Sequence, residues 1–199
     1  GKTKDTADKY DAAKAEADRA VTAAETLIAD PNATQAEVDV ALANVNTKKA
    51  ALEKAKEALV DKATDDQVAE LKKADAALTP IAENTLTGVK TPNSIEAYKQ
   101  AVGAIQADLT QAKAKAAELV EKAKTNNATR AEATTALAKV EELKAKLEAA
   151  KGLLKDKANT TELTNAKEAL KALAATENVT AGKTKDTADK YDAAKAEAD

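Results

Sequence analysis

The 199-residue chain contains no cysteine, histidine, methionine, phenylalanine or tryptophan. Without cysteine it has no disulfides and no thiolate metal sites, and without histidine as well it offers catalysis few side chains. The only aromatic residues are Tyr10, Tyr98 and Tyr191, and the hydrophobic fraction of 44% is mostly alanine. Because each alanine buries little area, we expect thin, closely spaced helices with modest stability per unit.

Neither sign of charge dominates, since 31 Lys and Arg residues are interleaved with 34 Asp and Glu residues for a net charge of −3. There is no basic stripe, and the arginines are limited to Arg19 and Arg130, so we predict no nucleic-acid partner. No apolar run approaches the roughly 20 residues that cross a bilayer. We therefore expect no membrane insertion in this segment, and no signal peptide or anchor is visible.

One 18-residue stretch, GKTKDTADKYDAAKAEAD, occurs at residues 1–18 and again, unchanged, at 182–199. The offset of 181 residues indicates a tandem repeat, in which the array decides the architecture. A weaker repeat with an offset of 95 residues lies inside this period. It matches Thr34 with Thr129 and the Asp-Lys-Ala triplet at 61–63 with that at 156–158.

Apolar residues at helical spacing predict long helices at about 6–29, from 34, at 94–123 and from 129. Short helices are expected from about 64 and from about 160, with loops at 81–93 and 176–181. Capping boxes are expected where a threonine precedes Glu or Gln by three residues. The expected helix starts are Thr34, Thr64, Thr129, a cap at 93–96 that includes Ser94, and a cap at 159–162.

These elements predict an all-α fold of tandem antiparallel three-helix bundle modules, joined by near-continuous helices into an elongated rod. Near-continuity is expected because the junctions at 61–66 and 156–161 contain no Gly or Pro. We assign 1–63 to a partial module with two long helices, 64–158 to a complete module, and 159–199 to the start of the next. The alternative phase, with units at 1–78 and 94–175, uses the same helices in another grouping.

The segments at 33–52, 71–78, 91–102 and 128–147 resemble the FIVAR module ("found in various architectures"), most specifically in the pattern Ala-Thr-x-Ala-Glu. This three-helix unit is arrayed in cell-wall-anchored surface proteins of Gram-positive bacteria, among them a matrix-binding protein of staphylococci. The resemblance covers 64–158 as a full module and the flanks as partial ones. It implies an extracellular, cell-wall-anchored location.

No catalytic, cofactor-binding or metal-binding residue is predicted. Ser94, the only serine, is interpreted as a capping hydroxyl. The acidic pairs Asp5/Asp8 and Asp65/Asp66 lack the glycine-containing spacing of a calcium loop and are interpreted as helix-start acids. The tyrosines are interpreted as buried side chains whose hydroxyls reach loop backbone.

The function expected from the repeats is that of an elongated stalk or spacer in a bacterial surface adhesin, which projects an adhesive region from the cell wall. The alternative is direct binding of a host extracellular-matrix or serum protein, such as fibronectin. Enzymatic activity is not expected. The expected partners are neighbouring repeats of the same chain, and the segment itself is expected to be a monomer.

Overall fold

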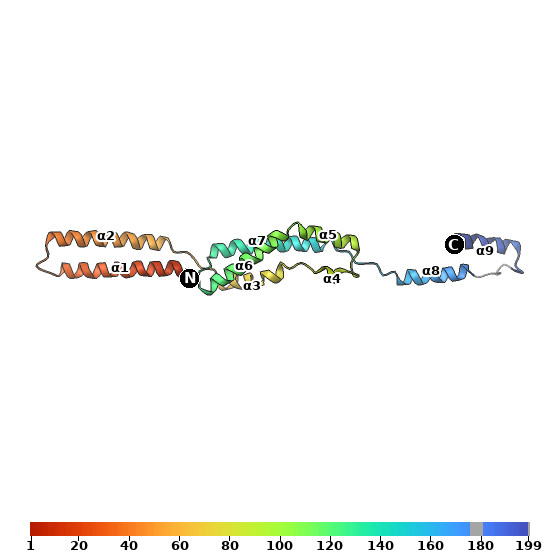
Figure 1. Ribbon diagram of the computed structural model, residues 1–199, viewed down its shortest axis with the longest axis horizontal. Coiled ribbons are helices and arrows are strands. Elements are labelled where there is room, and N and C mark those ends of the chain that lie inside the picture. Colours follow the sequence, from red (N-terminus) through yellow and green to blue (C-terminus); the bar gives the residue numbers. More distant parts are fainter. Residues whose placement is uncertain (176–180, 199) are drawn as a thin grey trace.

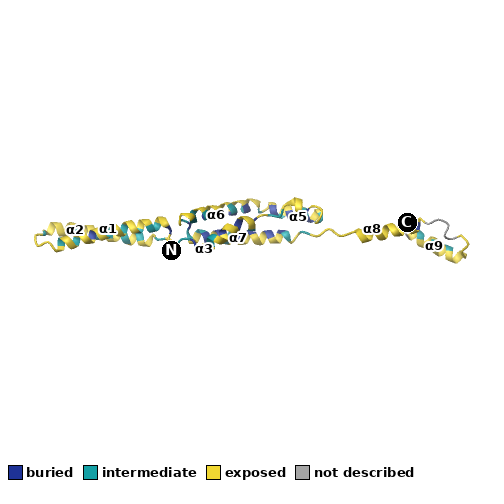
Figure 2. Cartoon of the chain, turned by 90° about the horizontal axis from the view of Figure 1, so that it is seen from below, coloured by how far each residue is buried: buried dark blue, intermediate teal, exposed yellow. Residues whose placement is uncertain are grey.

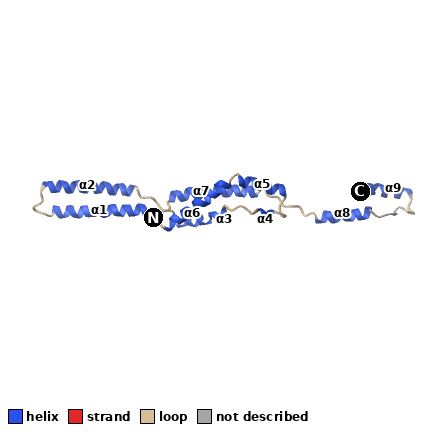
Figure 3. Ribbon diagram, viewed as in Figure 1, coloured by secondary structure: helices blue, strands red, loops and turns tan. Residues whose placement is uncertain are grey.

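The computed structural model describes residues 1–175 and 181–198, and over these residues it contains helices and no strand (Figures 1 and 3). The expected all-α class is therefore confirmed for the described part of the chain. The expected loop at 176–181 lies almost wholly outside the described residues. The helices are α1 Lys4–Ile28, α2 Gln35–Glu57, α3 Asp65–Ala77, α4 Glu83–Leu86, α5 Pro92–Gly103, α6 Gln106–Lys124, α7 Arg130–Lys151, α8 Thr161–Ala174 and α9 Lys185–Ala198.

The helices form three groups that follow one another along the long axis of the molecule (Figure 1). Helices α1 and α2 pack side by side at one end, and α8 contacts α9 at the other. Between them, α3 packs against both α6 and α7, which also contact each other, and α5 packs against α7. Within the described residues, the central group is therefore the one in which three helices, α3, α6 and α7, all pack against one another.

The hydrophobic core lies almost entirely in this central bundle, where the buried residues concentrate (Figure 2). Its largest fully buried side chains are those of Leu78, Leu109, Leu119, Leu143 and Leu147. Helix α7 contributes six buried residues, whereas α2, which matches α7 in the internal repeat, contributes none. The difference follows from packing, because α7 is covered by α3, α5 and α6, whereas α2 packs along α1.

The expected near-continuous helices between groups are absent. Helix α2 ends at Glu57 and α3 begins at Asp65, and α7 ends at Lys151 and α8 begins at Thr161. The residues between them adopt extended or turn conformations, with isolated bridges at Asp61, Lys62 and Asp156. The absence of Gly and Pro did not make these segments helical, because their backbone groups bond to distant parts of the chain instead.

The single long helix expected at 94–123 is also wrong, because it is divided into α5 and α6 at Gly103. Ile105 leaves the helical conformation with φ −115° and ψ 2°. A side chain at Gly103 would meet no other atom within 4 Å, so close helix approach does not explain this glycine. Its weak helix propensity accounts for the break at this point.

The expected capping boxes are confirmed at Thr34, Thr64 and Thr129, each of which has an extended backbone and accepts the N–H three residues later. At the other two expected starts no capping box forms. Helix α5 begins at Pro92, two residues before Ser94, since proline is well suited to the first helical position. At α8, Asn159 Oδ1 accepts the Thr161 N–H at 3.0 Å instead of a capping box forming.

Candidate functional site

The connection between α2 and α3, which we call the first junction, is built from three segments at 1–4, 60–63 and 126–130. These come from the start of the chain, the α2–α3 connection and the α6–α7 turn. Five backbone hydrogen bonds of 2.8–3.0 Å join them: Thr3 N to Val60 O, Lys62 N to Gly1 O, Ala63 N to Ala128 O, Arg130 N to Asp61 O, and Lys4 N to Asn126 O. The α1–α2 hairpin is thus attached to the central bundle by its ends.

Side chains reinforce the first junction. Asp61 pairs with Lys2 at 2.8 Å and with Arg130 at 3.6 Å, so one carboxylate connects both neighbouring segments. The hydrogen bond and charge of Lys2, together with the charge of Arg130, lower the pKa of Asp61. The Lys62 ammonium donates to Asn126 Oδ1 at 2.9 Å, and Thr3 is buried.

The first turn of α1 also bonds to the α6–α7 turn. The Asp5 N–H donates to Asn127 Oδ1 at 3.0 Å, and Asn127 Nδ2 donates to Asp5 Oδ1 at 2.8 Å. The Lys4 N–H donates to the carbonyl of Asn126, whose φ of 59° lies in the left-handed region that asparagine tolerates. Asp5, which the sequence offered as a candidate calcium ligand, thus bonds to the α6–α7 turn.

The connection between α7 and α8, which we call the second junction, repeats this arrangement. Thr91 N donates to Lys155 O at 2.9 Å and Lys157 N to Val89 O at 2.8 Å. Lys90 pairs with Asp156 at 2.6 Å, as Lys2 does with Asp61. Lys2 and Lys90 are 88 residues apart, the same offset that separates Tyr10 from Tyr98. Asp61 and Asp156 are 95 residues apart, the offset of the internal repeat. The internal repeat therefore extends to the geometry of the junction.

The two junctions differ in one respect. The α6–α7 turn supplies a third segment to the first junction, where it bonds to Asp61 and Ala63. Within residues 1–175 and 181–198, no segment makes the corresponding backbone bonds to Asp156 and Ala158 at the second junction.

Ser94 belongs to the second junction and is not a capping residue. Its hydroxyl accepts the Lys155 N–H at 3.1 Å and donates to the Thr91 carbonyl at 2.9 Å, and the residue is buried. Thr6 takes the same position at the first junction, accepting the Val60 N–H at 3.2 Å. The interpretation of Ser94 as a cap was wrong, because only the folded chain brings Lys155 beside it.

The tyrosines occupy equivalent sequence positions in different environments. Tyr98 is 2% exposed, and its hydroxyl accepts the Ile81 N–H at 2.7 Å, which confirms the expected contact with loop backbone. Tyr10 is only partly buried. The buried hydroxyl of Tyr191 has no hydrogen-bond partner among the described residues.

The remaining candidate residues lie on helix surfaces. Asp65 and Asp66 are in the first turn of α3, where the helix dipole favours acids. The described residues contain no group of three or more Asp or Glu side chains placed to hold a metal ion. Two exposed ion pairs with i,i+4 spacing join Glu118 with Lys122 at 2.8 Å and Glu142 with Lys146 at 2.6 Å. Such pairs support helices.

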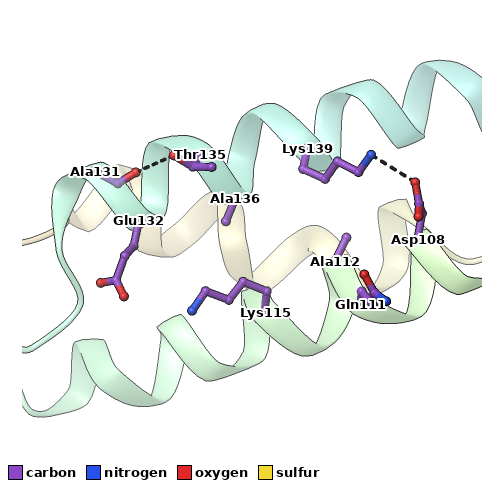
Figure 4. A pocket seen from close by; sticks show the side chains of 9 residues that line it. All are labelled: Asp108, Gln111, Ala112, Lys115, Ala131, Glu132, Thr135, Ala136 and Lys139. Carbon is purple, nitrogen blue, oxygen red and sulfur yellow. Dashed lines mark hydrogen bonds and ion pairs between the residues drawn. The ribbon is translucent and has the colours of Figure 1, made fainter.

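A groove of about 510 Å³ lies between α6 and α7 (Figure 4). Ala112 and Ala136 form its apolar floor, and an ion pair of 3.1 Å between Lys139 and Asp108 crosses one end. Glu132 lies near the other end. The hydroxyl and N–H of Thr129, together with Lys122, lower its pKa to about 2. It is therefore ionised at neutral pH and acts as a helix cap, not as a proton donor.

The residues of the junctions were not identified as a site from the sequence, although a signal was present. The Asp-Lys-Ala triplets at 61–63 and 156–158 match, and Lys-Thr precedes both Tyr10 and Tyr98 by the same number of residues. Those matches established the repeat but did not show that the matched segments bond to each other.

None of the helices in the described ranges has an apolar stretch long enough to cross a membrane. No family model matches the sequence, and no solved structure matches the chain.

Proposed function

We propose that the chain is a segment of an elongated stalk or spacer, built from repeated helical modules of the FIVAR type. Its role is to hold an adhesive region of a surface protein away from the cell wall of a Gram-positive bacterium. The neighbouring repeats of the same chain are its partners in this role. The succession of helix groups along one axis supports the proposal (Figure 1).

The repeated junction is the observation that carries the proposal. A spacer transmits length only if its connections resist bending, and a flexible linker behaves instead as a random coil. At both junctions an extended segment is bonded to the preceding part of the chain by two backbone hydrogen bonds and a Lys–Asp ion pair. These bonds close each helix group at its base. At the first junction the bonds from 126–130 to Lys4, Asp61 and Ala63 also restrict the orientation of the α1–α2 hairpin relative to the central bundle.

Small-angle X-ray scattering on chains of one, two and three 181-residue periods tests this function. The longest dimension is expected to increase by a constant increment with each period, since each module contacts only its neighbours. A particle whose longest dimension stops growing between one and three periods would overturn the stalk.

A linker replacement tests the junction itself. Replacing 60–63 by Gly-Ser-Gly-Ser is expected to shorten the average longest dimension and broaden its distribution, because the bonds to 1–4 and 126–130 are lost. The same replacement at 30–33, the tip of the α1–α2 hairpin, is the matched control and is expected to leave the dimension unchanged. Equal effects of the two replacements would show that the junction does not set the shape.

Binding of a host matrix protein such as fibronectin is the second candidate function, and the apolar floor of the α6–α7 groove favours it. The groove lacks the aromatic and arginine residues that usually anchor protein interfaces. Titrating immobilised fibronectin with the chain tests this function, with Ala136→Glu as the variant expected to weaken a groove-dependent interaction. Absence of saturable binding would exclude this candidate for fibronectin and leave the stalk unaffected.

A further inference from the structure

Among the described residues, two apolar helix faces remain largely exposed. On α2, Val38 is 40% exposed and Leu42 is 57% exposed. Their counterparts on α7, Ala133 and Leu137, are buried and partly buried in the core of the central bundle. Helix α8 carries a second such face, on which Leu163, Leu170 and Leu173 are all exposed.

The central bundle shows how a short helix and two long helices of one module pack together. Its short helix α3 lies against α6 and α7 and buries Leu71, Ala74 and Leu78. By the 95-residue offset, α8 corresponds to α3 and α2 corresponds to α7. The chain thus carries the short helix of a module at one end and a pair of long helices at the other, far apart in the structure (Figure 1).

The contact between α8 and α9 identifies which long helix α8 recognises. A small cavity there is lined by Leu170 and Leu173 of α8 and by Tyr191 and Ala194 of α9. Because 182–199 repeats 1–18 without change, α1 carries the same two residues as Tyr10 and Ala13, both of which are partly buried. Helix α9 is a single helix, whereas α1 lies beside α2 in the hairpin. Docking on the hairpin would therefore cover α8 with two helices instead of one.

We propose that α8 of one chain docks on the α1–α2 hairpin of a second copy of this chain, completing a three-helix bundle like that of α3, α6 and α7. Residues 1–18 of the second copy take the place of 182–199 on α8. The proposal stands on the repeat and on the two apolar faces, and it does not depend on the stalk function.

A second contact fixes the polarity of this docking. The segment Asn-Ala-Thr at 32–34 repeats the Asn-Ala-Thr at 127–129 of the α6–α7 turn. At the first junction, this turn bonds to Asp61 and Ala63. With α8 on the hairpin, the tip of the second copy reaches Asp156 and Ala158, where the described residues make no such bonds. The interface joins different surfaces at opposite ends of the elongated chain (Figure 1), so each pair of copies keeps one free α8 and one free hairpin for further copies.

Sedimentation equilibrium of the whole chain, from about 5 to about 500 µM, tests the proposal. The weight-average mass is expected to rise beyond that of a dimer with increasing concentration. Leu173→Glu on α8 and Leu42→Glu on α2 are each expected to weaken association by about tenfold or more, because each places a charge in the covered face. A mass equal to one chain throughout this range would overturn the proposal.

Val40→Glu is the matched control. Val40 is 71% exposed on the same helix as Leu42, but its counterpart Thr135 lines the groove between α6 and α7 and not the face toward α3. Association is expected to be unchanged in this variant. If Val40→Glu weakens association as strongly as Leu42→Glu, the proposed face is wrong.

Mixing the two variants separates this interface from any symmetric one. Leu42→Glu retains an intact α8 and Leu173→Glu retains an intact hairpin, so an equimolar mixture is expected to form a 1:1 dimer and stop there. The mixture remains decisive even if Leu173→Glu unfolds α8, because that copy contributes only its hairpin. Failure of the mixture to associate more strongly than either variant alone would overturn the proposal.

Discussion

The Ser94 hydroxyl accepts a hydrogen bond from the backbone N–H of Lys155, 61 residues further along the chain, at 3.1 Å. The same side chain donates to the carbonyl of Thr91, so it connects the start of α5 with the segment that leaves α7. Thr6 and Val60 repeat the relationship at the first junction. A hydroxyl at this position therefore connects the first helical turn of a group with the segment that leaves the last helix of the same group.

Substituting Ser94→Ala is expected to destabilise the central bundle by about 1–2 kcal/mol, because the buried hydroxyl and its bonds are lost. The free energy of unfolding is measured by urea titration followed by circular dichroism. Thr110→Ala is the control, since that exposed hydroxyl donates only to Gln106 within its own helix. An equal, small loss in the two variants would contradict the junction role of Ser94.

Substituting Tyr98→Phe is expected to cost about 1 kcal/mol, because the Ile81 N–H loses its acceptor while the ring stays in place. The equivalent changes Tyr10→Phe and Tyr191→Phe are expected to cost less than about 0.5 kcal/mol, since the structure gives neither hydroxyl a hydrogen-bond partner among the described residues. Thermal unfolding of the three variants in parallel provides the comparison. Equal effects at the three positions would argue against a specific role for the Tyr98 hydroxyl.

The repeat supplies a matched pair of leucines for a core test. Leu147 of α7 is fully buried, whereas its counterpart Leu52 of α2 is only partly buried. Leu147→Ala is expected to cost about 2–5 kcal/mol, the range for buried leucines, and Leu52→Ala about half of that or less. Urea unfolding measures both, and the prediction fails if Leu52→Ala is as destabilising as Leu147→Ala.

Acid is expected to weaken the start of α7. The pKa of Glu132 is about 2 in the folded chain, below the usual 4.5, so its stabilising effect is complete above about pH 4.5 and is lost as the pH falls toward 2. The loss is expected to be on the order of 1 kcal/mol, because the side chain is 34% exposed and solvent screens its contacts.

Comparing Glu132→Gln with the unaltered chain at pH 6 and at pH 2.5 checks this effect. The difference in unfolding free energy is expected to be largest at pH 6 and to shrink at pH 2.5. Glu121→Gln, which removes only an exposed pair with Lys124, is the control. A difference for Glu132→Gln that is the same at both pH values would contradict the prediction.

The helices and most of their starts were predictable because the signals are local. The threonine caps at 34, 64 and 129 each depend on a side chain three residues away, and the apolar spacing within each helix selects its face. The position of Tyr98 near the start of the helix that follows the loop at 81–93 likewise indicated a contact with loop backbone, which the Ile81 N–H provides. Local sequence also predicted a cap at Ser94, wrongly, because Pro92 begins the helix first.

The sequence by itself determined the all-α class, the two repeat offsets, and the residues available to each helix face. Only the tertiary structure decided that the junctions are extended, that α3 lies against α6 and α7, and that Ser94 bonds to Lys155. The physical reason is the range of the interactions involved. A cap or a helical face is satisfied within a few residues, whereas the backbone groups at 60–63 and 155–157 find their partners on segments up to 69 residues away, such as Ala128 for Ala63 and Arg130 for Asp61.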